Sequence, residues 1–205
     1  MFIFCTPSTV TLNSYLCTVP CSLAVDVNRE EESCPRIISR DGWAARAPLS
    51  VEYMIVPVKN VIVQHSFTLK CTSLTLCSQR VSLIQDFYMD ERHEDDIAES
   101  FLIGGDGNVY EGTGWHRVGN HTEGYNSKAI GISMIGDFRD MLPPARQLEA
   151  LRHLLRCGVA SGELDPDYKL LARRQLSRGE ARGVGVALFL ELQTWPQWAG
   201  QPSLG

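Results

Sequence analysis

Residues 61–66 read Val-Ile-Val-Gln-His-Ser, a β-branched apolar run that ends in polar side chains. Its length and composition predict a buried β-strand. Residues 101–104 and 109–111 flank the dipeptide Asp-Gly at 106–107, which predicts a hairpin. The apolar run 129–135 predicts a third buried strand, in the centre of a sheet.

Helical spacing appears between these strands. Apolar side chains recur every three to four residues in 81–88, and again in 148–155, between the helix-starting Pro143-Pro144 and Gly158. The segment 186–192 fits a strand by alternation, but its spacing also fits a helix, which we favour. Strands interspersed with helices predict an α/β domain with a central mixed sheet flanked by about three helices.

Length and charge limit the possible functions. The chain has 205 residues, of which 44% are apolar, enough to bury the core of one domain. A net charge of -5 argues against nucleic acid as a partner, because a polyanion-binding surface needs clustered Lys and Arg. After the N-terminal region no segment approaches the roughly 20 apolar residues of a membrane span.

The N-terminal region resembles a secretory signal peptide. Residues 1–24 carry no charge and end in Ser22-Leu23-Ala24, a small-x-small pattern, which predicts export to the extracellular space. The alternative is a disordered or wrongly assigned N-terminus. We expect a charged linker at 25–33, the folded domain at 34–199 and a short tail at 200–205.

The cysteines fit this interpretation. Of the seven, a cut after Ala24 leaves four, an even number suited to an oxidising compartment: Cys34, Cys71, Cys77 and Cys157. Three pairings are possible. The short spacing favours a bridge between Cys71 and Cys77, which leaves Cys34 for Cys157. The absence of Cys-x-x-Cys argues against a structural zinc ribbon.

Six motifs follow one another between residues 34 and 199. They are Gly42-Trp43-Ala44-Ala45-Arg46, Val61 to Ser66, Phe101 to Gly107, Val109-Tyr110-Glu111-Gly112-Thr113-Gly114-Trp115, Ile130 to Gly136, and Trp195-Pro196-Gln197-Trp198. In this order they resemble the peptidoglycan recognition protein family, whose fold is shared with bacteriophage-type zinc amidases. The resemblance implies an amidase-like fold, and the family's cysteine pairs match Cys71 with Cys77 and, in some members, Cys34 with Cys157.

The resemblance also shows where amidase members hold zinc. Their His, His and Cys ligands correspond here to Gln64, Arg173 and Ala181, and their catalytic tyrosine corresponds to Glu99. A catalytic zinc needs three protein ligands and an open position, which this set does not supply. His65 is no substitute, because neighbouring strand residues point to opposite faces. We therefore expect no zinc, no other cofactor and no hydrolysis.

The family's cleft implies a set of ligand contacts. The strand end, the first long helix and the loop 114–125 would border it. The candidate contacts are Gln64, Ser66, Tyr88, Arg92, Trp115, His116, His121, Tyr125, Asn126 and Arg173. Arg173 would hold a carboxylate of the stem peptide. The structural alternatives are core packing for Trp115 and loop stabilisation for Tyr125 and Asn126.

Three positions bear on selectivity. Thr113 lies where members that bind diaminopimelate-type stems tend to have Arg, so lysine-type peptidoglycan is slightly favoured. His93-Glu94 matches neither usual helix-end pair, and Glu94 would disfavour an anionic stem. Asn120-His121-Thr122 is a glycosylation sequon beside the expected cleft.

The resemblance implies a secreted, non-catalytic protein of innate immunity that binds bacterial peptidoglycan and passes the signal to immune signalling proteins. One alternative is a zinc-dependent N-acetylmuramoyl-L-alanine amidase. The other is a regulatory or decoy module that binds other immune proteins and no glycan.

Overall fold

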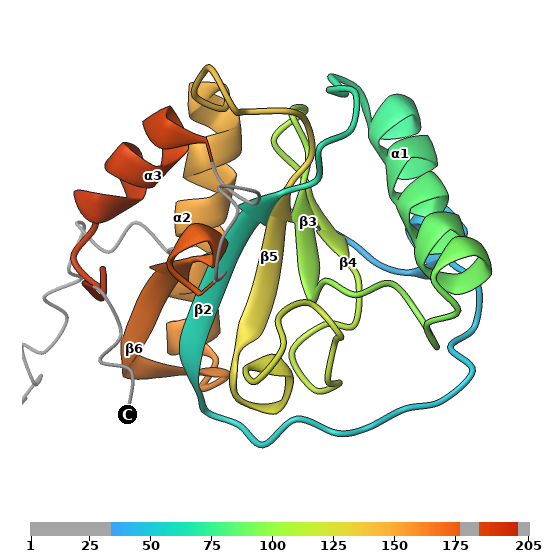
Figure 1. The fold of residues 1–205 in the computed structure, drawn as a ribbon, viewed down its shortest axis with the longest axis horizontal. Coiled ribbons are helices and arrows are strands. Elements are labelled where there is room, and N and C mark those ends of the chain that lie inside the picture. Colours follow the sequence, from blue (N-terminus) through green and yellow to red (C-terminus); the bar gives the residue numbers. More distant parts are fainter. Residues whose placement is uncertain (1–33, 177–184, 201–205) are drawn as a thin grey trace, which may run out of the picture. The chain divides into compact units, whose positions relative to one another are not determined.

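The computed structural model describes residues 34–176 and 185–200. Within them, six strands form one mixed sheet in the order β1-β4-β3-β5-β2-β6 (Figure 1). All neighbouring strands are parallel except the β3–β4 hairpin. The strands are β1 (Ile37–Ile38), β2 (Val58–His65), β3 (Phe101–Ile103), β4 (Val109–Glu111), β5 (Ile130–Met134) and β6 (Leu164–Ala172).

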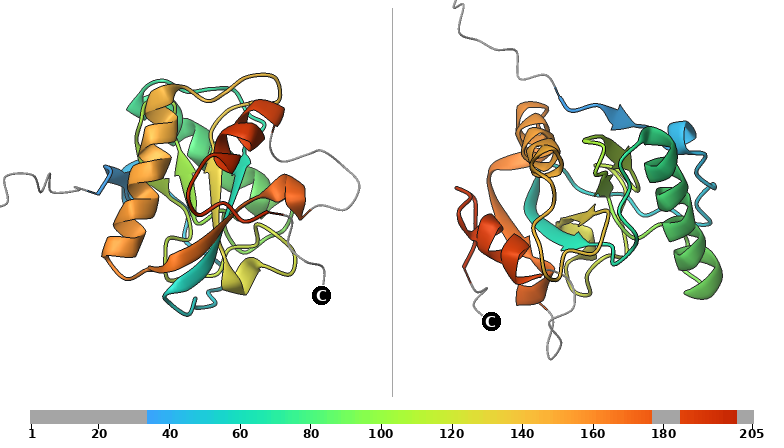
Figure 2. Two further views of the ribbon diagram at one scale, coloured as in Figure 1. Left: turned by 90° about the vertical axis from the view of Figure 1, so that its left-hand side faces the viewer. Right: turned by 90° about the horizontal axis from the view of Figure 1, so that it is seen from above.

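The helices cover both faces of this sheet. α1 (Leu74–Asp86) lies on one face, and α2 (Ala145–Ala160) and α3 (Val186–Gln193) lie on the other (Figures 1 and 2). A π-helical turn, η2 (Phe87–Glu91), directly continues α1. The short 3₁₀ turns are η1 (Asp41–Trp43), η3 (Asn126–Lys128) and η4 (Arg173–Gln175). The predicted mixed sheet with three helices is confirmed, as is the helical form of 186–192.

Strand β2 shows how the sheet separates two environments. Val61 and Val63 belong to the core cluster that includes residues of α2 and α3, whereas Ile62 lies in another cluster with Leu171. Successive side chains of a strand point to opposite faces, so Gln64 shares the face of Ile62. His65 is buried on the other face, where its Nδ1 accepts a hydrogen bond from the Phe138 amide at 2.9 Å.

Two features differ from the sequence prediction. Helix α2 does not stop before Gly158 but continues to Ala160. A Cβ on Gly158 would lie 2.7 Å from Cη2 of Trp115, so this glycine permits close packing and is not a helix terminator. Strand β6 was not predicted, because Pro166 and several charged residues interrupt its apolar pattern. It is recruited by pairing with the buried strand β2.

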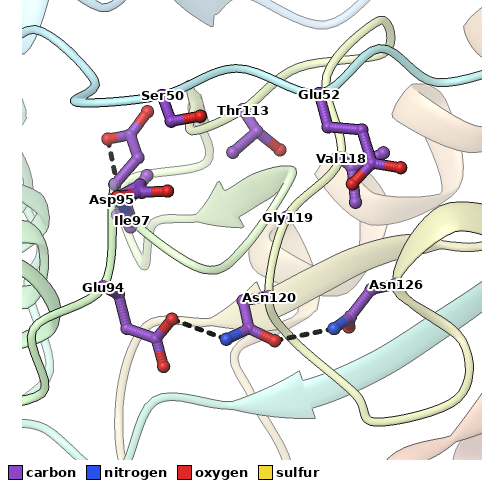
Figure 3. A pocket seen from close by; sticks show the side chains of 11 residues that line it. Ser50, Glu52, Glu94, Asp95, Ile97, Thr113, Val118, Gly119, Asn120 and Asn126 are labelled. Atoms are coloured by element: carbon purple, nitrogen blue, oxygen red, sulfur yellow. Dashed lines mark hydrogen bonds between the residues drawn. The ribbon is translucent and has the colours of Figure 1, made fainter.

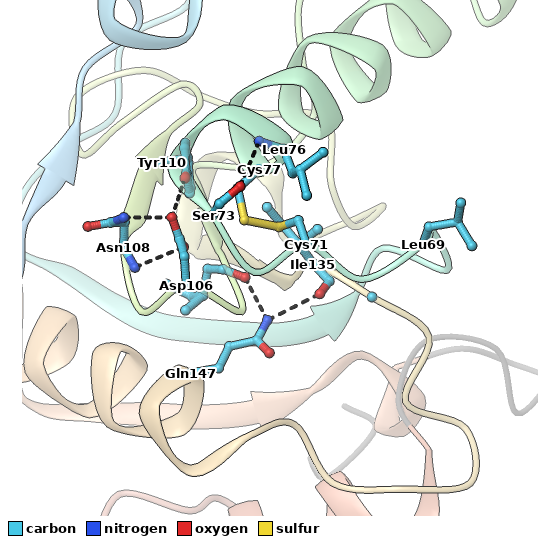
Figure 4. Close-up of a disulfide and its surroundings, with 12 residues drawn as sticks. Leu69, Cys71, Ser73, Leu76, Cys77, Asp106, Asn108, Tyr110, Ile135 and Gln147 are labelled. Atoms are coloured by element: carbon cyan, nitrogen blue, oxygen red, sulfur yellow. Dashed lines mark hydrogen bonds between the residues drawn. A yellow bond between two sulfur atoms is a disulfide. The ribbon is translucent and has the colours of Figure 1, made fainter.

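The described chain contains two disulfides, one within a short segment and one between distant segments. Cys71 is bonded to Cys77 in the first turn of α1, beside the hairpin that Asp106 stabilises by accepting the Tyr110 hydroxyl at 2.7 Å (Figure 4). Cys34 is bonded to Cys157 of α2. These are the two pairs that the short spacing and the resemblance favour. No helix in the described part of the chain is long and apolar enough to cross a membrane.

Candidate ligand-binding site

A buried hydrogen-bonded chain lies at the carboxyl end of β2. The Gln64 amide nitrogen donates to Oε1 of Glu99 at 2.8 Å, and the Tyr88 hydroxyl donates to the same oxygen at 3.2 Å. Gln64 comes from the end of β2, Tyr88 from η2 and Glu99 from the segment just before β3. Parallel pairing of β2 and β3 with β5 brings these three segments together, although they are 11 to 35 residues apart.

Arg173 extends the chain from the other side. It follows β6, and its Nη1 donates to Oε1 of Gln64 at 2.8 Å and also to the carbonyl oxygen of His121. Both ends of the Gln64 amide are therefore engaged, the nitrogen by a carboxylate and the oxygen by a guanidinium. A charged donor makes a stronger hydrogen bond than a neutral one, so Gln64 is held firmly in one orientation.

Burial determines the electrostatics of this group. Glu99 is only 2% exposed, and this burial raises the pKa of its carboxyl above the ordinary value. The negative charge of Glu99 in turn raises the pKa of the Tyr88 hydroxyl, which stays protonated as a donor. Among the described residues, Oε2 of Glu99 has no hydrogen-bond partner. The site thus holds a polar carboxyl oxygen that the fold leaves unsatisfied.

His121 supports the loop above the sheet. Its ring packs on Gly131 of β5, where a Cβ would lie 2.3 Å from Cγ of the imidazole, so only glycine leaves room. Nε2 lies 3.1 Å from the Ala129 carbonyl and Nδ1 lies 3.1 Å from the Thr122 hydroxyl. Burial lowers the pKa of His121 to about 4, so the ring is neutral at physiological pH. His121 is 1% exposed, so its ring lies beneath the surface in this structure, and its role as a ligand contact stays a prediction.

Asn120 and Asn126 form the rim of the loop. Asn120 donates to the Glu94 carboxylate and accepts from the Asn126 amide at 2.6 Å (Figure 3). The Asn126 side-chain oxygen accepts the Thr122 amide at 2.7 Å. This is the loop stabilisation that the sequence offered as an alternative for Asn126.

The remaining predicted contacts separate into two groups. Arg92 lies over the ring of Tyr88, 5.9 Å from its centroid, at the exposed edge of the buried chain. Tyr125 packs against the cluster that contains Ile62, on the same face as Gln64. The Ser66 hydroxyl is bonded to Thr68 at 2.7 Å and accepts the Gly136 amide at 3.0 Å.

The structure does not bring Trp115 and His116 to this group. Trp115 is partly buried and packs on Phe101, with 4.6 Å between ring centroids, against the core cluster on the opposite side of the sheet. His116 is exposed and pairs with Glu163 at 2.9 Å. Core packing, the alternative weighed for Trp115, is what the fold requires, because Phe101 points toward α2.

Comparison with known proteins identifies the family. The family model described as N-acetylmuramoyl-L-alanine amidase matches residues 56–182. Peptidoglycan-recognition protein 2 of Holotrichia diomphalia is 40% identical over 88% of this chain and 95% of its own. This chain belongs to the peptidoglycan recognition protein family.

Solved structures agree. Wild-type Drosophila PGRP-LB superposes with a TM-score of 0.79 at 41% identity, covering 82% of this chain and 98% of its own. Peptidoglycan recognition protein-LE in complex with tracheal cytotoxin, described as monomeric diaminopimelic acid-type peptidoglycan, superposes with a TM-score of 0.77 at 39% identity, covering 80% and 95%. The predicted amidase-like fold is confirmed.

In this peptidoglycan recognition protein, the resemblance assigns Gln64 and Arg173 to the family's zinc position, and the contacts of these two residues do not fit a metal ion. The side-chain oxygen is the one metal ligand that Gln64 could offer. This oxygen already accepts a hydrogen bond from the Arg173 guanidinium. A second positive charge there would be repelled. No group of three or more His, Cys, Asp or Glu within 34–176 and 185–200 could hold a metal. Ala181, the third corresponding position, lies outside the described residues.

A pocket of about 300 Å³ opens beside the Asn120 rim of this protein (Figure 3). It was not predicted, because its walls come from segments that are distant in sequence. The acidic run 94–96 was the available signal, but nothing in the sequence placed Glu52 or Thr113 beside it. Its lining includes Ser50, Glu52, Glu94, Asp95, Asp96, Ile97, Thr113, Val118, Gly119, Asn120 and Asn126.

Proposed function

We propose that this protein binds bacterial peptidoglycan outside the cell and acts in innate immune recognition without hydrolysing it. Family membership supports the ligand class, since relatives are named for peptidoglycan recognition and one solved relative holds a peptidoglycan fragment. Signalling to immune proteins, secretion through residues 1–24 and a slight preference for lysine-type stems, based on Thr113, belong to the same proposal.

The observation that carries the non-catalytic part is the Arg173 hydrogen bond to Gln64 at 2.8 Å. Zinc amidase chemistry uses a cation to acidify water and polarise a carbonyl. Here a guanidinium stands beside the corresponding position, and a guanidinium has no open coordination position and stays protonated. The buried Glu99 accepts from Gln64 in place of the catalytic tyrosine.

Recognition would use the surface that remains around this chain. Arg92 and Tyr88 lie at one edge, and Tyr125 and Asn126 lie at the other. Aromatic faces and exposed Arg and Asn donors suit a ligand that combines sugar hydroxyls with peptide carboxylates. Arg173 would hold a carboxylate of the stem peptide.

The test is a binding assay with a product readout. The secreted protein is incubated with insoluble lysine-type and diaminopimelate-type peptidoglycan, retention is measured by pull-down, and released stem peptide by mass spectrometry. Retention without peptide release is expected, with bound zinc well below one ion per chain by elemental analysis. A Drosophila PGRP-LB sample run in parallel provides a structurally matched comparison.

The two alternatives give different results. The amidase match over residues 56–182 favours testing hydrolysis directly. Stoichiometric zinc together with released peptide would establish an amidase. Failure to bind either peptidoglycan, together with capture of another immune protein, would establish the regulatory or decoy module.

A glycan at Asn120 would change access to the rim. The Asn120 side chain is exposed, but its amide donates to Glu94, so a sugar on that nitrogen would project beside the pocket. Intact-mass measurement of the secreted protein before and after deglycosylation tests the modification. A mass equal to that of the unmodified mature chain would rule it out.

A further inference from the structure

An exposed apolar stripe runs along residues 49–56, the segment that leads into β2 (Figure 1). Its four apolar side chains occupy alternate positions and are 41% to 86% exposed: Leu49, Val51, Tyr53 and Ile55. Met54, between the last two, is buried and joins the core cluster. Alternation of this kind is typical of a half-buried strand, whose apolar side normally faces the core. Here the alternating apolar side chains face solvent instead.

One backbone edge of this segment is already paired. The Met54 amide and the Glu52 carbonyl form hydrogen bonds of 2.9 Å to the segment that contains Arg117. These two bonds flank an antiparallel bridge between Tyr53 and Arg117. In such a pair, the amide and carbonyl groups of successive residues point alternately to the two edges of the strand. The backbone groups of Tyr53 therefore point to the opposite edge, away from Arg117.

The opposite edge is unpaired. Within the described residues, no hydrogen bond is formed by the amides or carbonyls of Val51, Tyr53 and Ile55. An unpaired strand edge is a template for pairing with another strand, and proteins commonly protect it with charged side chains or proline. None of these three residues is charged, and the flanking prolines, Pro48 and Pro57, lie outside them. The edge is therefore open to a partner strand that also covers apolar side chains.

We infer that two copies of this protein associate through this edge, by antiparallel pairing about a twofold axis at Tyr53. Tyr53 then lies opposite its equivalent in the second copy, and Val51 lies opposite Ile55. Each opposed pair exchanges two hydrogen bonds, so the pairing engages all three unpaired residues in both copies. The inference concerns the protein without peptidoglycan and does not depend on the proposed function.

A second copy fits because the edge is complementary to itself. A twofold interface brings the same patch of both subunits together, and here it opposes aromatic with aromatic and β-branched with β-branched side chains, which stabilise antiparallel strands. Glu52, the one charged residue of the segment, lies opposite Met54 of the other copy, so no like charges meet. A register centred on Ile55 would oppose Tyr53 with Pro57, which has no N–H to donate. Charge and backbone groups thus favour the register centred on Tyr53.

The first test is sedimentation velocity of the full secreted, disulfide-bonded protein without peptidoglycan. The contact is short, so we expect a weak monomer–dimer equilibrium with a Kd on the order of 100 µM. A monomer at every concentration up to about 1 mM would overturn the inference.

Lysine substitutions test the surface. Ile55→Lys places a charge at the most exposed position of the stripe, and it should weaken dimerisation by about tenfold or more, because a charged edge resists strand pairing. Leu69→Lys is the matched control, since Leu69 is 73% exposed in the loop between β2 and α1, and it should dimerise like the wild type. Both sites are exposed, so both variants should fold, which far-UV circular dichroism checks. Equal dimerisation of Ile55→Lys and the wild type would contradict the inference.

Cysteine cross-linking tests the twofold axis. Across a hydrogen-bonded antiparallel pair the Cα atoms are about 5.5 Å apart, which is within reach of a disulfide. Tyr53→Cys should therefore form a covalent dimer under mild oxidation, and the exposed control Leu69→Cys should not. Comparable cross-linking rates at the two positions would mean that the contact is nonspecific and the inference wrong.

Val51→Cys and Ile55→Cys test the register. In the inferred dimer each of these residues lies opposite the other, whereas it lies more than about 13 Å from its own equivalent, four positions along the strands. A mixture of the two variants should therefore give the mixed dimer faster than either variant links to itself, as measured by intact mass spectrometry. Preferential linking of either variant to itself would overturn the pairing centred on Tyr53.

Discussion

Arg173 and Glu99 lie at opposite ends of a buried chain whose middle member is Gln64. The resemblance placed Gln64, Tyr88 and Arg173 near one another, and the structure brings all three together. For Glu99 the resemblance implied only that the family's catalytic tyrosine is replaced. Its role as the shared acceptor of Gln64 and Tyr88 could not be predicted, because no local pattern records which buried side chains meet.

Arg173→Ala tests the guanidinium. The change removes a charged donor from the Gln64 oxygen and from the His121 carbonyl, so the free energy of unfolding should fall by about 2 kcal/mol. Urea unfolding at neutral pH measures it. Arg173→Lys keeps the charge but not the planar fork and should recover only part of the loss. An unchanged midpoint for Arg173→Ala would show that these bonds contribute no net stability.

Glu99→Gln tests the buried carboxyl through pH. Burial raises its folded pKa above 4.5, so the folded state keeps a proton that the unfolded chain loses as the pH rises. The free energy of unfolding should therefore fall with rising pH above about 4.5, until the folded pKa is passed, by up to about 1.4 kcal/mol per pH unit from this group.

The Gln variant should lack that contribution. Urea unfolding of both proteins at several pH values isolates it, because other titrating groups cancel in the difference. The lowered pKa of His121, about 4, acts in the opposite direction. It makes the free energy of unfolding fall as the pH drops from 6.5 toward 4, because the unfolded histidine takes up a proton that the folded one does not. Parallel stability curves for wild type and Glu99→Gln would contradict the assignment to Glu99.

Helix α2 shows where tertiary contact overrides a local signal. Glycine commonly ends a helix, and the sequence prediction stopped before Gly158. In the structure the helix passes through it because Trp115 and Leu164 pack against its bare backbone. The strands with continuous apolar runs, β2 and β5, and the hairpin β3–β4 were predicted, since burial on both faces or a turn dipeptide leaves a local pattern.

Gly158→Ala measures this packing. In a helix the change would ordinarily stabilise by up to about 1 kcal/mol. Here the added Cβ would meet the Trp115 ring at 2.7 Å, so we expect a net loss of about 1–3 kcal/mol in urea unfolding. Combining it with Trp115→Phe, which removes the contacting ring atom, should reduce the penalty. A stabilised Gly158→Ala variant would show that the ring moves aside at little cost.

The two disulfides constrain the molecule over different lengths. Cys34 and Cys157 are 123 residues apart, whereas Cys71 and Cys77 are 6 apart. In the chain-entropy description a longer closed loop stabilises more, because it removes more freedom from the unfolded chain.

Paired Cys→Ser variants should follow this order. Removing Cys34–Cys157 should lower the free energy of unfolding by about 5 kcal/mol, and removing Cys71–Cys77 by about 2 kcal/mol. Urea unfolding of both double variants under identical conditions provides the measurement. The reverse ranking would mean that local strain or residual structure in the unfolded chain dominates.

The sequence by itself determined the α/β class, the main buried strands, the cysteine pairs and the family, because each leaves a local pattern or an ordered set of motifs. Only the tertiary structure decided that Trp115 packs against the core, that Glu99 accepts hydrogen bonds from Gln64 and Tyr88, and that Glu52 and Thr113 share a pocket with Asp95. The physical reason is strand order: the pairing of β2, β3 and β5 determines which distant side chains meet, and this pairing depends on packing across the whole sheet.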